Sequence, residues 1–92
     1  MTSGAKETLL LGDEYDDHLR DVLQHVVIEL GGKPLRSSWG LGGSQVIETW
    51  EVEIDGAVLL IEAETYMGLS LIGDSALVQR VRDLVDKRRQ RG

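Results

Sequence analysis

The spacing of apolar residues predicts two amphipathic helices. In residues 13–30 the apolar positions recur every three or four residues, which is the period of an α-helix. Acidic residues crowd the start of this segment, where the helix dipole favours negative charge, and Gly31-Gly32 follows its end, as glycine commonly does. The same spacing returns after Asp74-Ser75, between Leu77 and Val85. We therefore expect one helix over residues 13–30 and another that begins near residue 75.

The segment between these helices alternates between apolar and polar residues and predicts antiparallel strands. Asp55-Gly56 separates two alternating runs and is the residue pair that favours a two-residue type I′ hairpin turn. That turn fixes a register in which Trp50 faces Ile61 and Glu51 faces Leu60. Because this register also collects the apolar residues of both strands on one side, the turn and the alternation support the same hairpin.

Glycine makes the strand boundaries on either side of this hairpin less distinct. Lys33-Pro34 opens an extended piece over residues 35–39, and the glycine-rich residues 40–44 are expected to form a mobile loop. Around Gly68 the apolar positions keep their parity, whereas a two-residue turn would exchange it. We therefore prefer a kink at Gly68 within one continuing strand, with a longer turn as the alternative.

Together these elements indicate an α+β fold within a single domain, residues 1–92. The expected order is α-β-β-β-(β)-α, an antiparallel sheet of three to four strands with both helices on one face, since both apolar stripes must be buried. Residues 1–12 and 88–92 are expected to be flexible. No apolar run approaches the roughly 20 residues of a membrane-spanning helix, and residues 1–12 do not resemble a secretory signal. We therefore expect a cytoplasmic protein with no membrane partner.

The chain is acidic, with 10 basic and 16 acidic residues and a formal net charge of −6. The basic end, residues 87–92, holds four of the positive charges and none of the negative ones, which leaves 6 basic against 16 acidic residues in the remainder. Such a remainder repels phosphate backbones and favours a partner protein with a basic surface. Positive charge is also favoured at a helix C-terminus, so nucleic-acid binding through Lys87–Arg91 is the weaker alternative.

The sheet face turned away from the helices is expected to mix carboxylates with apolar side chains. Apolar groups ringed by charge are typical of interaction surfaces. Paired carboxylates also occur in glycoside hydrolases and cation sites, but those sites need further ligands or a cleft. We therefore predict that this face binds another protein or a second copy of the chain. The predicted partner-binding residues are Ile47, Glu51, Glu53, Val58, Leu60, Glu62, Glu64 and Tyr66, together with Trp39 on the preceding strand.

His18 and His25 lie seven residues apart on one flank of the first helix, with Asp21 between them. Seven helical residues span about 10 Å, too far for both imidazoles to reach one metal ion easily. A solvated helix flank is the simpler interpretation, so we predict neither a metal nor a cofactor. A small enzyme or metal-dependent binder that uses these residues with the sheet carboxylates is kept as an alternative.

The absence of cysteine excludes a disulfide scaffold, a thiolate zinc site and a cysteine nucleophile. No set of residues supplies a nucleophile, a base and oxyanion donors together, so catalysis is disfavoured and no catalytic residue is assigned. The favoured function is that of a small acidic protein that acts by binding another protein. In size, acidity and lack of cysteine the chain resembles bacterial inhibitors and toxin-neutralising immunity proteins, although no motif specific to one family accompanies the resemblance.

Overall fold

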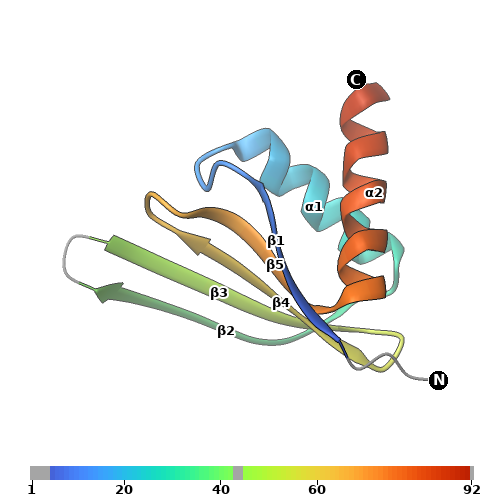
Figure 1. Cartoon of the computed structure of the whole chain (residues 1–92), viewed down its shortest axis with the longest axis horizontal. Coiled ribbons are helices and arrows are strands. Elements are labelled where there is room, and N and C mark those ends of the chain that lie inside the picture. Colours follow the sequence, from blue (N-terminus) through green and yellow to red (C-terminus); the bar gives the residue numbers. More distant parts are fainter. Residues whose placement is uncertain (1–4, 43–44, 92) are drawn as a thin grey trace.

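Two helices lie on one side of a five-stranded antiparallel sheet (Figure 1). The computed structural model describes residues 5–42 and 45–91. The sheet order is β1-β5-β4-β3-β2, so the first strand of the chain pairs with the last. The elements are β1 (Lys6–Gly12), α1 (Asp17–Glu29), β2 (Lys33–Gly42), β3 (Gln45–Ile54), β4 (Ala57–Glu64), β5 (Gly68–Asp74) and α2 (Ser75–Arg91). The predicted α+β class is confirmed, but the sheet has five strands, and a strand precedes the first helix.

The hydrophobic core lies between the helices and one face of the central strands. Alternate residues of β4 and β5 face the helices, and Leu59 and Leu71 are fully buried there. Both helices meet this face with their apolar stripes, as the spacing along the chain predicts. The helical core residues are Leu19, Val22, Leu23, Val26 and Val27 of α1 and Leu77, Val78, Val81 and Val85 of α2.

The β3–β4 hairpin has the predicted register. Trp50 pairs with Ile61, and Glu51 pairs with Leu60. The φ angles of Asp55 and Gly56 are 52° and 81°, and a type I′ turn requires positive φ at both of these positions. The local turn signal and the alternation of the strands were therefore sufficient to define this hairpin.

The preferred interpretation of Gly68 is wrong, and the longer turn is correct. β4 ends at Glu64, which pairs with Gly68 across a connection of residues 65–67. The Met67 N–H closes this turn by donating to the Glu64 carbonyl at 2.9 Å. A three-residue connection keeps the parity of the inward positions, so that Ala63 pairs with Leu69, and the sequence pattern therefore looks like one continuing strand.

Strand β1 is an element that the sequence did not predict. Residues 6–12, which we expected to belong to a flexible end, pair with β5, and Leu9 lies opposite Leu71. Three consecutive leucines hide the alternation, because Leu9 and Leu11 pack against the core while Leu10 is 61% exposed on the other side. The chain then turns, and α1 begins at Asp17 rather than at residue 13.

Strand β2 is longer than predicted. Residues 40–42, assigned to a mobile loop, continue β2 and pair with β3 as far as Gly42 opposite Gln45. The other residues of that expected loop, 43–44, lie outside the described part of the chain. The register of β2 shifts between Pro34 and Arg36, which marks a bulge near its start. Glycine and serine obscured this strand because they carry no apolar alternation.

Helix α2 is tied to β1 at its first turn. The Glu7 carboxylate accepts hydrogen bonds from the Ser75 hydroxyl at 2.8 Å and from the Gln79 side-chain amide at 3.1 Å. The hydrogen bond from Ser75 lowers the pKa of Glu7 below its ordinary value most strongly, and the hydrogen bond from Gln79 comes next. The nearby charge of Arg82 lowers the pKa further. At its other end, α2 includes residues 88–91, which we expected to be flexible.

Removing the Glu7 charge should destabilise the fold at neutral pH more than in acid. Because the folded-state pKa of Glu7 is lowered, its ionised form stabilises the fold above the unfolded pKa of about 4.3, and this contribution is lost as the pH falls through the folded-state pKa. We expect Glu7→Gln to lower the melting temperature modestly at pH 7 and by less at pH 3. Thermal unfolding across this range, with Glu53→Gln as the control, measures the difference. An effect of Glu7→Gln that is independent of pH would contradict this linkage.

A methyl group at Gly68 should destabilise the protein more than one at Gly56. Both residues have positive φ, but a Cβ at Gly68 would lie 2.6 Å from the Gly12 carbonyl oxygen, whereas nothing lies within 4 Å of a Cβ at Gly56. We expect Gly56→Ala to cost about 1–2 kcal/mol from backbone strain alone and Gly68→Ala to cost clearly more. Urea unfolding of the two variants compares them, and equal losses would show that the β1–β5 contact yields without cost.

Candidate functional site

The outer face of the sheet, the side opposite both helices, is the first candidate site (Figure 1). Leu60 lies on this face between two cross-strand neighbours, Ile72 on β5 and Glu51 on β3. Val58, the next outward residue of β4, is 49% exposed, while Leu60 and Ile72 are half-buried. We call these three side chains (Val58, Leu60 and Ile72) the apolar row. They lie on a face that the helices leave open.

Four glutamates border the apolar row. Glu51 and Glu53 lie on β3 directly opposite Leu60 and Val58, and Glu62 and Glu64 continue the outward positions of β4. All four are partly exposed. Among the side chains that the structure describes, none of the four forms an ion pair. Lys33 and Arg36 of β2 lie at the register positions opposite Glu53 and Glu51, so the outer face is acidic along β4 and mixed in charge toward β2.

The structure brings most of the predicted partner-binding residues together but separates two of them. Residues 47, 51, 53, 58, 60, 62 and 64 share the outer face, as the strand register requires. Tyr66 lies instead in the turn at the end of β4. The Trp39 backbone pairs with Glu48, and the Trp39 side chain lies outside the side chains that the structure describes.

Tyr66 has an exposed ring and a strained backbone conformation. Its side chain is 81% exposed, and its φ of 70° lies in the left-handed region, which a bulky residue rarely adopts. The turn is fixed from below, because the Tyr66 N–H donates to a carboxylate oxygen of the buried Glu14 at 2.9 Å. Backbone strain of this kind is concentrated at functional sites, so Tyr66 is a candidate contact residue.

Three more exposed apolar residues were missed by sequence analysis. Tyr15 follows Glu14 and is 67% exposed, although its spacing fits the apolar stripe of the helix expected over residues 13–30. Met67 and Leu10, each 61% exposed, flank Gly68, where an added Cβ would lie 2.6 Å from Leu10 Cδ1. None of the three gave a clear signal, because a run of three leucines does not show in the sequence which of them a strand turns outward.

Replacing Tyr66 by asparagine should not destabilise the fold. Asparagine tolerates positive φ, and the ring of Tyr66 buries little area, so we expect Tyr66→Asn to leave the free energy of unfolding unchanged or to raise it by up to about 1 kcal/mol. Urea unfolding beside Tyr15→Asn, an exposed tyrosine without positive φ, gives the comparison. A loss for Tyr66→Asn that exceeds the loss for Tyr15→Asn would show that the Tyr66 ring is held by packing.

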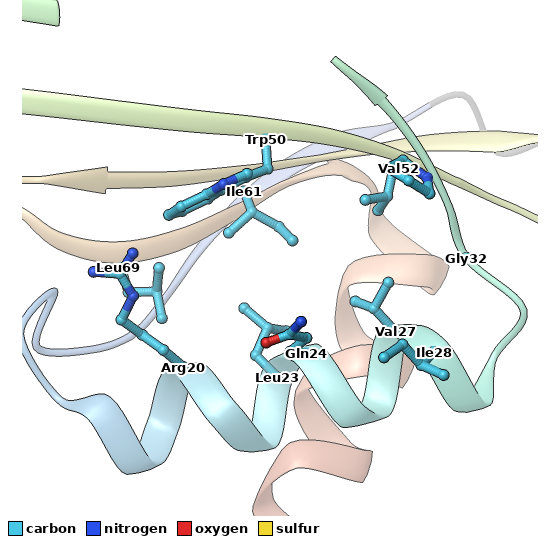
Figure 2. Close-up of a pocket in the computed structure, with 11 residues that line it drawn as sticks. Arg20, Leu23, Gln24, Val27, Ile28, Gly32, Trp50, Val52, Ile61 and Leu69 are labelled. Atoms are coloured by element: carbon cyan, nitrogen blue, oxygen red, sulfur yellow. The ribbon is translucent and has the colours of Figure 1, made fainter. Parts of the chain in front are cut away.

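A cleft on the other side of the sheet is the second candidate site (Figure 2). It lies between α1 and the helix-facing side of the sheet and has a volume of about 450 Å³. Trp50, Val52 and Ile61 project from the sheet toward α1. The residues that line the cleft are Arg20, Leu23, Gln24, Val27, Ile28, Gly32, Pro34, Trp50, Val52, Ile61 and Leu69.

Arg20 is the one charged residue among those that line the cleft. Its guanidinium carbon lies 5.1 Å from the centre of the Trp50 ring, a distance typical of a cation–π contact. The guanidinium also donates to the Glu14 carbonyl oxygen at 3.2 Å and to Glu48 Oε1 at 3.4 Å. These contacts hold a positive charge at one end of an apolar cleft.

The histidine flank of α1 does not join the sheet carboxylates. His18, Asp21 and His25 are exposed, and His25 Nδ1 lies 2.8 Å from the Asp21 carbonyl oxygen. The four outer-face glutamates alternate along β3 and β4 with the buried residues that face the helices, so they lie on the opposite face of the sheet from α1. In residues 5–42 and 45–91, no group of three or more histidine, aspartate or glutamate side chains is placed to hold a metal ion.

The basic end of α2 has acidic partners within the chain. Arg88 pairs with Glu29 at 3.1 Å and Arg89 with Asp16 at 3.4 Å, which ties the end of α2 to both ends of α1. Both arginines are at least one-third exposed, so each pair contributes at most about 1 kcal/mol to stability. The pairs nevertheless reduce the positive charge that this end can offer to phosphates.

Comparisons of the chain with protein-family models, with curated proteins and with solved structures give no match. Within the described residues, neither helix combines the length and the apolar character needed to cross a bilayer.

Proposed function

We propose that this is a small non-catalytic protein that binds a partner protein with a basic surface through the outer face of its sheet. One observation carries the proposal: a face open to solvent combines the apolar row with four glutamates that have no ion-pair partner among the described side chains. Apolar area at the centre with charge around it is the usual composition of a protein interface.

The outer face is large enough for such a contact. Five strands, each about 4.8 Å wide and seven to ten residues long, give a flat area of roughly 24 by 23–33 Å. Protruding side chains and the exposed residues around Tyr66 add accessible surface to this flat area. One partner buries roughly 800 Å² in an interface of standard size. Burial of the apolar row then supplies affinity, and the glutamates steer the approach of positive charge.

Charge favours a different protein over a second copy of the chain. In a two-fold dimer the same patch meets itself, so four glutamates of each copy would be brought together, with Lys33 and Arg36 of β2 offsetting only part of their charge. Desolvated like charges are unfavourable, whereas lysine or arginine side chains of a basic partner would pair with Glu51, Glu53, Glu62 and Glu64. The likeness in size and acidity to bacterial inhibitors and immunity proteins is consistent with such a partner.

Leu60→Lys should abolish partner binding and leave the fold intact. Leu60 lies half-buried at the centre of the outer face, so a lysine there breaks the apolar row without entering the core. Immobilised wild type, Leu60→Lys and the matched control His25→Lys, which changes the other side of the molecule, are compared by capture from lysate and mass spectrometry. We expect basic proteins on wild type and on the control, released by roughly 0.5 M salt, and none of them on Leu60→Lys.

Two outcomes would contradict this proposal. Equal capture by Leu60→Lys would remove the outer face as the binding site. Light scattering that shows a wild-type dimer, dissociated by Leu60→Lys, would replace the basic partner by a second copy of the chain. Circular dichroism of each variant confirms that the comparison is made between folded proteins.

A further inference from the structure

We infer that the cleft between α1 and the sheet binds an amphiphilic anion with a linear apolar tail, of the class of medium-chain carboxylates. The cleft lies on the opposite side of the sheet from the outer face (Figure 2), so this second binding activity is independent of the proposed partner. Three features of the cleft support the inference: its volume and lining, its polarity, and the state of its one charged residue.

The volume and lining suit a small apolar ligand. A volume of about 450 Å³ falls within the range of roughly 300–1,000 Å³ that is usual for small-molecule sites. The walls are built from buried aliphatic side chains, among them Leu23 at 4%, Ile61 at 6% and Leu69 at 1% exposure. These residues form the floor, whereas Ile28, at 63% exposure, and the half-buried Trp50 bring apolar surface into contact with water, which a hydrocarbon tail would remove.

The two ends of the cleft differ in charge. Arg20 and Trp50 lie toward one end, whereas Ile28 and Gly32 line the other. Arg20 and Ile28 are eight residues apart on α1, which corresponds to about 12 Å along the helix. An occupant that matches this shape is long and narrow and carries a charged group at one end only.

Arg20 is positioned to receive an anionic head group. Contact with Trp50 and the hydrogen bond to the Glu14 carbonyl oxygen hold the guanidinium in place, which lowers the entropic cost of binding. Its ion pair with Glu48 is long, at 3.4 Å, and both side chains are about one-third exposed, so that pair is weak and can be exchanged. A guanidinium presents five N–H donors in a planar fork that matches a carboxylate.

A series of ligands that differ only in head-group charge tests this inference. Octanoate, octanol and octylammonium are titrated into the full chain at pH 7, and binding is followed by amide chemical shifts in two-dimensional NMR. We expect octanoate to shift amides of residues 20–28 and 50–52 and to bind about tenfold more tightly than octanol. The net charge of −6 favours octylammonium at long range, so a preference for octanoate must come from Arg20.

Two variants locate the site. Arg20→Gln should weaken octanoate binding about tenfold, to the level of octanol, and leave octanol binding unchanged, which shows that the cleft persists. Gln24→Phe places a ring at the exposed rim of the cleft and should weaken all three ligands. His25→Phe, the same change one residue further along α1 and outside the cleft lining, should weaken none.

The inference is overturned if octylammonium binds as tightly as octanoate, or if Arg20→Gln leaves octanoate binding unchanged. Shifts confined to the Val58 and Leu60 region would place the ligands on the outer face instead. Failure of all three ligands to bind at millimolar concentration would exclude a small amphiphile and leave an apolar side chain of a partner protein as the occupant. Ligand titration and capture through Leu60 are separate measurements on opposite faces of the sheet, so either proposal can fail while the other stands.

Discussion

The register of the β3–β4 hairpin is the constraint on which the rest of this structure depends. Side chains alternate between the two faces of a sheet, so a slip of one residue would exchange the faces. The turn at Asp55-Gly56 prevents the slip by fixing Ile61 opposite Trp50. With that register, one face receives the residues that both helices bury, and the other receives the glutamates and the apolar row.

Local signals predicted the elements that are specified locally. The two helices and the hairpin each contain their own pattern within a few residues, and the structure confirms all three. β1 could not be predicted in this way, because its three leucines show no alternation and its partner β5 lies about 60 residues away in the chain. The turn before Gly68 was ambiguous for a geometric reason, since a three-residue connection and a continuing strand leave the same parity of apolar positions.

The two candidate sites differ in the same way, because one could be predicted from local sequence and the other could not. The outer face follows from strand alternation alone, so its residues could be named from the sequence. The cleft could not, because Arg20 and Trp50 are 30 residues apart and meet only through the packing of α1 over the sheet. Tyr66 was assigned to the outer face, and the structure places it in a turn at positive φ; a backbone angle of this kind leaves no trace in the hydrophobic pattern.

Both proposed sites carry costs that the small core must offset. A domain of this size has a stability of only about 5–15 kcal/mol, yet it leaves the apolar row exposed, holds Tyr66 in a strained conformation and keeps a cleft open beside buried leucines. A ligand that binds only the folded chain raises its stability in proportion to the logarithm of ligand concentration. Trp50 and Glu51 are consecutive in β3 and face the cleft and the outer face respectively. The same short strand therefore supports both surfaces, and occupation of either one stabilises the scaffold that presents the other.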